Sequence, residues 1–129
     1  DEVIIPVSME ILAMSGAQQF IEYLQELNQV LHSGAVLRLI LPTMYDSRRR
    51  VSKFIVSQLK GLGPNVAKPI RIDTRLSEAP GFGKTIYEYA PHSRGAIDYA
   101  RFTELVARMP AISANSSSQP EPGARARAA

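Results

Sequence analysis

The chain has 129 residues, 45% of them hydrophobic, which predicts a folded core and suits one domain or part of one. It contains no cysteine, so disulfide bonds and thiolate metal sites are excluded. No apolar run approaches the roughly 18 residues of a membrane helix. Because the chain opens inside an expected strand and not on a methionine, we expect it to be the C-terminal portion of a longer protein.

The charge of the chain is unevenly distributed. The net charge is +3, but residues 1–47 carry six acidic residues and one basic residue, whereas residues 48–75 carry eight basic residues and one acidic residue. A concentrated basic segment of this kind attracts polyanions even when the whole chain is nearly balanced. The two histidines, His32 and His92, lack the spacing of metal ligands.

The first third of the chain is predicted to form a strand, a helix and a second strand. Residues 3–7 and 36–41 are nearly continuous apolar runs, which is typical of strands buried on both faces of a parallel sheet. A helix is predicted between them over residues 15–31, with Ser15 and Gln18 as a capping box. Its apolar stripe consists of Ala17, Phe20, Ile21, Leu24, Leu27 and Leu31.

A second helix is predicted over residues 48–60, capped by Asp46 or Ser47. Its polar side is basic and its apolar side is formed by Val51, Phe54, Ile55 and Leu59. Such a polar face is usually only solvated. Here no acidic residue follows Asp46 until the end of the next expected strand, so nothing in this segment neutralises the face, and an anion-binding role stays open.

A third strand is predicted over residues 67–72, followed by a polar loop over residues 75–84 in which Ser77 caps a single helical turn. Residues 87–91 are expected to be a connection. A last helix is predicted over residues 93–108, with Ile97, Ala100, Leu105 and Val106 facing inward. We expect one domain over residues 1–109 and a disordered tail over residues 110–129, where bulky side chains are nearly absent.

This order of elements predicts an α/β fold, half of a mostly parallel sheet with flanking helices. Gly83-Lys84-Thr85 has the ending of a phosphate-binding loop, G-x-x-x-x-G-K-[ST]. The first glycine of that pattern is replaced by Glu78, whose carboxylate repels phosphate, and Pro80 removes a backbone donor. We therefore expect no phosphate site there.

Four blocks of the sequence, in this order and spacing, resemble the ParA/Soj family of partitioning ATPases, which is related to MinD. The resemblance extends over residues 1–108 and identifies the chain as the C-terminal half of a family member. The block Arg75-Leu76-Ser77-Glu78-Ala79-Pro80 is the most specific. The other three blocks are Val3-Ile4-Ile5-Pro6-Val7 with Glu10 and Gly16, Thr43-Met44-Tyr45-Asp46-Ser47-Arg48, and Ser93-Arg94-Gly95-Ala96 with Tyr89.

The resemblance implies a P-loop ATPase that binds ATP with magnesium and forms a homodimer around two nucleotides. It further implies non-specific binding to double-stranded DNA, a ParB-type partner that stimulates hydrolysis, and a cytoplasmic, nucleoid-associated protein. The phosphate loop and the acidic residues for magnesium and water lie near the N-terminus in this family. Their motifs are missing from this chain, so we expect no catalytic or metal-binding residue in it and no hydrolysis by it alone.

The resemblance places two groups of site residues in this half. Residues beside the adenine and ribose are expected at Thr43, Met44, Arg71, Ile72 and Asp73. The last three stand where the family often has Pro-Arg-Asn, and Asp73 is expected to accept a hydrogen bond from the base amino group or a sugar hydroxyl. DNA-binding residues are expected at Arg48 and Arg75, which match family positions, and at Arg49, Arg50 and Lys53, which the local charge adds.

Two other interpretations remain open at this stage. The chain is alternatively a free-standing, non-catalytic DNA-binding or interaction module derived from the same fold. A MinD-like membrane role is disfavoured, because it needs a basic amphipathic C-terminal helix and the residues after Pro110 lack bulky apolar side chains.

Overall fold

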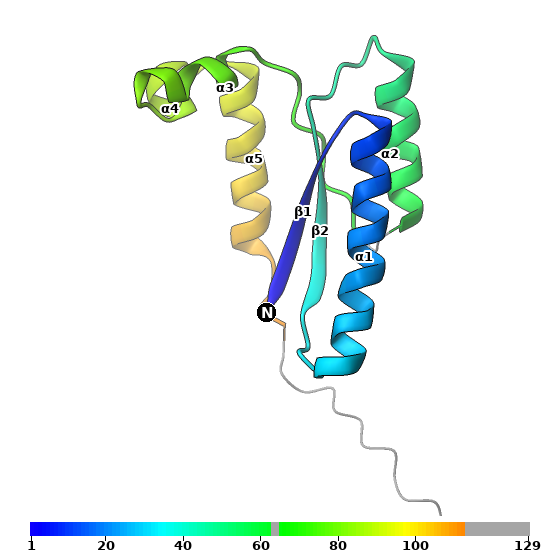
Figure 1. Ribbon diagram of the computed structural model, residues 1–129. Coiled ribbons are helices and arrows are strands. Elements are labelled where there is room, and N and C mark those ends of the chain that lie inside the picture. The colour runs from blue at the N-terminus through cyan, green and yellow to red at the C-terminus, as the bar shows by residue number, and fades with distance from the viewer. Residues whose placement is uncertain (63–64, 113–129) are drawn as a thin grey trace, which may run out of the picture.

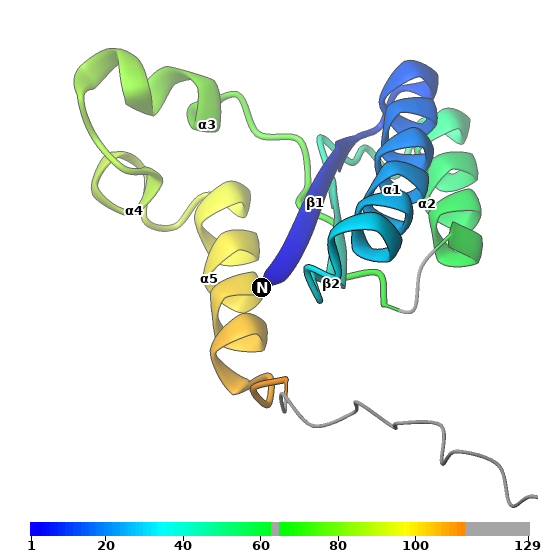
Figure 2. The ribbon, with the colours of Figure 1, turned by 60° about the horizontal axis from the view of Figure 1, so that its bottom comes forward.

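The computed structural model describes residues 1–62 and 65–112. It has three layers, with α1 (Ile11–Leu31) and α2 (Arg50–Leu62) on one side of a parallel sheet and α5 (Arg94–Arg108) on the other (Figure 1). Figure 2 shows the same arrangement from a second direction. The α/β fold is confirmed. Most of the tail expected over residues 110–129 lies outside the described residues.

The sheet is formed by β1 (Glu2–Ser8) and β2 (Val36–Thr43), which run parallel with Ile5 opposite Ile40. Both strands were predicted. The helix between them begins at Ile11, four residues before the expected start, so the Ser15–Gln18 capping box is wrong. Its first turn is instead closed by the Met14 N–H, which donates to the Glu10 carbonyl at 3.1 Å.

Both faces of β2 are buried, as its continuous apolar run predicted. Ile40 packs on one face with residues of α1 and α2, among them Ile21 and Ile55. Leu39 and Leu41 point to the opposite face and pack with residues of α5. β1 differs from this expectation, because Ile5 and Val7 are buried while Ile4 is 37% exposed. The carboxyl ends of both strands open between the two helical layers.

The third strand expected over residues 67–72 is an extended segment, and five backbone hydrogen bonds join residues 65–72 to residues 40–45. It forms two isolated parallel bridges, Ile40 with Val66 and Tyr45 with Arg71. Continuing the first bridge in register would pair residues 42 and 68 and would need N–H groups at residues 42 and 69. Both of these residues are prolines, which have no N–H. The extended segment therefore stays beside β2 without forming a regular ladder of hydrogen bonds.

Three short helical turns cross from this segment to α5. They are α3 (Arg75–Glu78), the 3-10 turn η1 (Ala79–Phe82) and α4 (Ile86–Tyr89), and they project away from the sheet (Figures 1 and 2). The helical turn expected at Ser77 exists, but it begins at Arg75. α4 lies where a connection was expected, and Thr85 and Glu88 form a capping box at its start.

The inward face of α5 differs from the expected one. Ile97 is 51% exposed and Leu105 is 43% exposed, while Asp98 is fully buried. The side chains that pack on the sheet side are Tyr99, Phe102, Val106 and Met109. The expectation is therefore right for Val106 and wrong for Ile97, Ala100 and Leu105. The inward side of the helix carries Asp98, whose partner Arg71 lies on another segment.

Ser93 caps α5, and its hydroxyl accepts a hydrogen bond from the Ala96 N–H at 3.1 Å. The Ser93→Ala substitution removes this acceptor in a buried place, so we expect it to lower the free energy of unfolding by about 1 kcal/mol. Urea denaturation measures the change. The exposed Thr103 of the same helix provides the matched control, because Thr103→Ala removes a hydroxyl without removing a cap. Equal stability of the two variants would contradict the role of Ser93.

Candidate functional site

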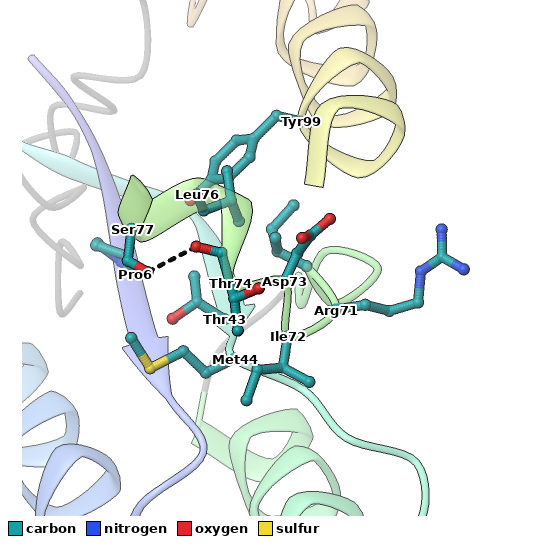
Figure 3. A pocket seen from close by; sticks show the side chains of 11 residues that line it. Pro6, Thr43, Met44, Arg71, Ile72, Asp73, Thr74, Leu76, Ser77 and Tyr99 are labelled. Atoms are coloured by element: carbon teal, nitrogen blue, oxygen red, sulfur yellow. Dashed lines mark hydrogen bonds between the residues drawn. The ribbon is translucent and has the colours of Figure 1, made fainter. Parts of the chain in front are cut away.

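The carboxyl ends of the strands open onto a cavity of about 510 Å³, shown in Figure 3. We call it the strand-end cavity. All five residues expected near the adenine and ribose line it, namely Thr43, Met44, Arg71, Ile72 and Asp73. Its other lining residues are Pro6, Ile70, Thr74, Leu76, Ser77 and Tyr99. A cavity of this size with mainly apolar walls suits a small organic ligand with a flat ring.

Met44 follows directly after β2 in an unusual backbone conformation. Its φ angle is 55°, in the left-handed region that residues other than glycine rarely adopt. The side chain is 58% exposed and lies beside Thr43 and Ile72 at the cavity (Figure 3). Backbone strain of this kind is concentrated at ligand sites, which agrees with a binding role for this turn.

Asp73 holds the cavity wall together. Its Oδ1 accepts hydrogen bonds from the Arg75 N–H at 3.1 Å and the Arg75 Nε at 2.9 Å, and its Oδ2 accepts one from the Gly95 N–H at 2.9 Å. Burial favours the neutral acid, but the bonds from Gly95 and Arg75 outweigh it and hold the pKa of Asp73 at about 2. Its side chain is only 2% exposed. These bonds hold Asp73 in the cavity wall, and its expected hydrogen bond with the base or a sugar hydroxyl stays a prediction.

Gly95 lets the start of α5 approach α3 at this point. A Cβ atom at residue 95 would lie 2.7 Å from the Cγ of Leu76, which is closer than real Cβ contacts. The absence of a side chain at residue 95 therefore allows the bond to Asp73 and the packing of Leu76 in the cavity wall.

Arg71 contributes backbone to the cavity while its side chain points away (Figure 3). Its Nε and Nη2 donate to the two carboxylate oxygens of Asp98, both at 2.9 Å, and its backbone N–H donates to Oδ2 at 2.9 Å. Arg101 lies 3.4 Å from the same carboxylate. Burial opposes the charge of Asp98, but the bonds from Arg71 keep the pKa of Asp98 below its usual value.

Gly83-Lys84-Thr85 is unsuited to hold a phosphate. The Gly83 N–H donates to the Pro80 carbonyl, the Lys84 N–H to the Ala79 carbonyl, and the Thr85 N–H to the Glu88 carboxylate. The backbone donors that a phosphate loop directs at its ligand are thus used within the loop itself. The prediction that this motif is only a partial match agrees with the structure.

The residues expected to bind DNA lie at the same end of the molecule as the cavity. Arg48 precedes α2 and is 86% exposed in its side chain, with Nε and Nη2 each 3.1 Å from the Asp46 carboxylate. These hydrogen bonds lower the pKa of Asp46. Arg49, Arg50 and Lys53 are exposed on the turn before α2 and on its first turn, and Arg75 starts α3. Figure 1 shows both helix starts at the carboxyl end of the sheet.

No family model matches the chain, but curated relatives do. It is 39% identical over 106 residues to the chromosome-partitioning ATPase Soj of Thermus thermophilus, covering 81% of this chain and 43% of that protein. It is 34% identical over 109 residues to the sporulation initiation inhibitor protein Soj of Bacillus subtilis, covering 83% of this chain and 43% of that protein.

The chain belongs to the ParA/Soj family. It spans less than half the length of the curated relatives it matches, which is consistent with the C-terminal part of a ParA protein. A chromosome partitioning protein ParA of Myxococcus xanthus is 32% identical over 101 residues, covering 77% of this chain and 36% of that protein.

A solved structure supports the same fold for this ParA chain. Cobyrinic acid a,c-diamide synthase of Mycobacterium smegmatis, with bound ADP and magnesium, superimposes with a TM-score of 0.59 at 28% identity, covering 83% of this chain and 37% of that one. In residues 1–62 and 65–112 of the ParA chain, no group of three or more His, Asp or Glu side chains is placed to hold a metal ion. Within the same ranges no helix is long and apolar enough to cross a membrane.

Sequence reasoning missed two residues of this ParA site. Asp98 was not predicted, because its partner Arg71 lies 27 residues away in the sequence. An acidic residue on the inward side of a helix is a signal that would have indicated a buried ion pair. Gly95 belongs to one of the family blocks. The structure explains why this residue is a glycine, because a side chain there would collide with Leu76.

Proposed function

We propose that this chain forms the base-contacting side and the DNA-binding surface of a ParA-type partitioning ATPase. The observation that carries the proposal is the strand-end cavity, which gathers all five expected nucleotide residues in a chain 39% identical to a partitioning ATPase. The proposed protein is a cytoplasmic, nucleoid-associated homodimer in its ATP-bound state, and a ParB-type partner stimulates its hydrolysis.

The cavity fits the base and ribose of a nucleotide. Met44, Ile72 and Tyr99 offer apolar surface to a flat ring, and the Thr43 hydroxyl and nearby backbone groups offer polar contacts. Asp73 and Gly95 keep this wall in place. ATP with magnesium, when bound, supplies a phosphoanhydride whose hydrolysis resets the protein, and we expect the remainder of the ParA domain to hold its phosphates.

The exposed cations explain how this surface binds DNA without reading sequence. Arg48, Arg49, Arg50 and Lys53 stand at one helix start, and Arg75 stands at another beside the cavity. Arginine and lysine that neutralise phosphates release counterions and give salt-sensitive binding to any duplex. Because the cations adjoin the nucleotide cavity, a change of nucleotide state can alter the DNA surface directly.

Binding of adenosine tests the nucleotide part of this proposal. If the cavity holds the base and ribose, adenosine binds the chain without any phosphate group and competes with ATP for the same place. Saturation-transfer NMR with the 129-residue chain measures both. The Ile72→Asp variant places a charge in the cavity wall and is expected to weaken adenosine binding at least about tenfold.

The matched control is Ile97→Asp, which alters an exposed isoleucine on the outer side of α5. Equal adenosine binding by the two variants would contradict the assignment of the cavity. Steady ATP hydrolysis by the 129-residue chain would contradict the proposal, because hydrolysis needs the phosphate loop and the acidic residues for magnesium and water, which we expect outside this chain.

A further inference from the structure

A second hollow of about 360 Å³ lies beside the strand-end cavity. Arg71 and Ile72 line both, so the segment after the last bridge to β2 separates the two spaces. Three arginines from three different segments line the second hollow, namely Arg48, Arg71 and Arg94. We call it the arginine hollow.

The carboxylates near the arginine hollow leave it with excess positive charge. Asp46 lines it and pairs with Arg48. Asp98 lies fully buried and pairs with Arg71. Arg94 has no carboxylate within ion-pair distance among the described residues. Two of the cations are therefore fixed in orientation by their partners, and the third is available to an incoming anion.

The position of Arg94 is unfavourable for its own helix. It is the first residue of α5, where the positive end of the helix dipole disfavours a cation. The first N–H groups of this helix are already bonded, since the Gly95 N–H donates to Asp73 and the Ala96 N–H donates to the Ser93 hydroxyl. The attraction of the hollow for an anion therefore comes from its three arginine side chains.

We propose that the arginine hollow binds a phosphate group between Arg48 and Arg94, with the Ser47 hydroxyl as a further donor and Arg71 as a fixed positive wall. This proposal rests on the proposed function. It adds Arg94 to the expected binding residues, because Arg94 lies outside the basic segment of residues 48–75. The phosphate belongs either to the backbone of a DNA duplex or to a free phosphate compound. Guanidinium groups suit both, because their paired N–H donors match two phosphate oxygens.

The test compares Arg94→Gln with Arg108→Gln, an exposed arginine about 21 Å further along the same helix. Duplex DNA of two unrelated sequences is titrated over a salt series, and inorganic phosphate is titrated separately by ³¹P line broadening. Loss of Arg94 is expected to reduce the slope of log affinity against log salt by about 0.9 and duplex affinity about three- to tenfold. Arg94→Gln does not endanger the fold, because it removes a cation from a helix start.

The outcomes separate the two proposals. Weaker duplex and phosphate binding by Arg94→Gln alone supports the hollow with a DNA phosphate as its ligand. Unchanged duplex binding with loss of phosphate binding supports the hollow with a free phosphate compound. If Arg94→Gln matches Arg108→Gln in both titrations, the hollow is refuted. Duplex binding by the unaltered protein would then still support the proposed DNA surface.

Discussion

The Arg48→Ala and Arg75→Ala substitutions are each expected to weaken binding to duplex DNA about three- to tenfold, and the double variant more than either. Each removes one cation from the carboxyl end of the sheet, and a protein that neutralises one phosphate fewer has a salt slope smaller by about 0.9. Fluorescence anisotropy with duplexes of unrelated sequence over a salt series measures both quantities. The reduction should be the same for every sequence, because phosphate contacts carry no base information.

Lys60→Ala is the matched control for this experiment. Lys60 is exposed on α2, about 15 Å from Arg50 along the helix and away from the strand ends. An equal reduction of affinity in Lys60→Ala would mean that the whole polar side of α2 binds DNA, and not only the cations at the carboxyl end of the sheet. Unchanged affinity in every variant would leave the basic segment as a solvated face.

The two arginines are expected to differ in their effect on stability. The Arg48 side chain is 86% exposed, so water weakens its ion pair with Asp46, and Arg48→Ala should leave the free energy of unfolding nearly unchanged. Arg75 binds Asp73, which is almost fully buried. The Arg75→Ala substitution removes the bond from the side-chain Nε and leaves that carboxylate with two backbone donors, the N–H groups of residues 75 and 95. A DNA defect in Arg75→Ala is therefore interpreted together with its urea denaturation curve.

The Asp98→Ala substitution is expected to lower the free energy of unfolding by about 2–3 kcal/mol. Asp98 accepts three hydrogen bonds from Arg71, one of them from the backbone, and the substitution leaves that N–H without its partner. The Arg71 side chain is 44% exposed and regains water, which keeps the destabilisation below that for a fully buried pair. Urea denaturation of Glu104→Ala, an exposed acid on the same helix, is the control, and equal stability of the two variants would refute the role of Asp98.

Acid should destabilise this protein through the same carboxylates. The pKa values of Asp98 and Asp73 lie below that of an unfolded aspartate, about 3.9. Their contribution to stability is therefore complete above that value and is lost as the pH falls through the folded pKa, which is about 2 for Asp73. The urea midpoint is expected to fall between about pH 4 and pH 2, and to fall less in Asp98→Asn. An identical acid response in that variant would show that Asp98 contributes nothing to it.

Some features of this ParA chain follow from sequence alone because they depend on neighbours along the chain. The apolar run of β2 correctly predicts a strand buried on both faces, since a strand without alternation has no solvent side. The same prediction is wrong for β1, in which Ile5 and Val7 are buried but Ile4 is 37% exposed. The hydrophobic spacing predicts α1, α2 and α5, although it misplaces the start of α1. The resemblance to the family predicts five residues beside the nucleotide, and the structure places all five in the lining of the strand-end cavity.

Other features were decided only by the tertiary structure, because they depend on groups far apart in the chain. The third strand is interrupted because the next two hydrogen bonds of its ladder with β2 would need N–H groups at residues 42 and 69, and both residues are prolines. The inward face of α5 is set by Asp98, whose partner Arg71 lies in another segment. Arg94 was absent from every expected binding site until folding placed it beside Arg48. Hydrophobic periodicity predicts which side of a helix or strand is buried. The partner of a charged group depends on how distant segments pack, which periodicity does not contain.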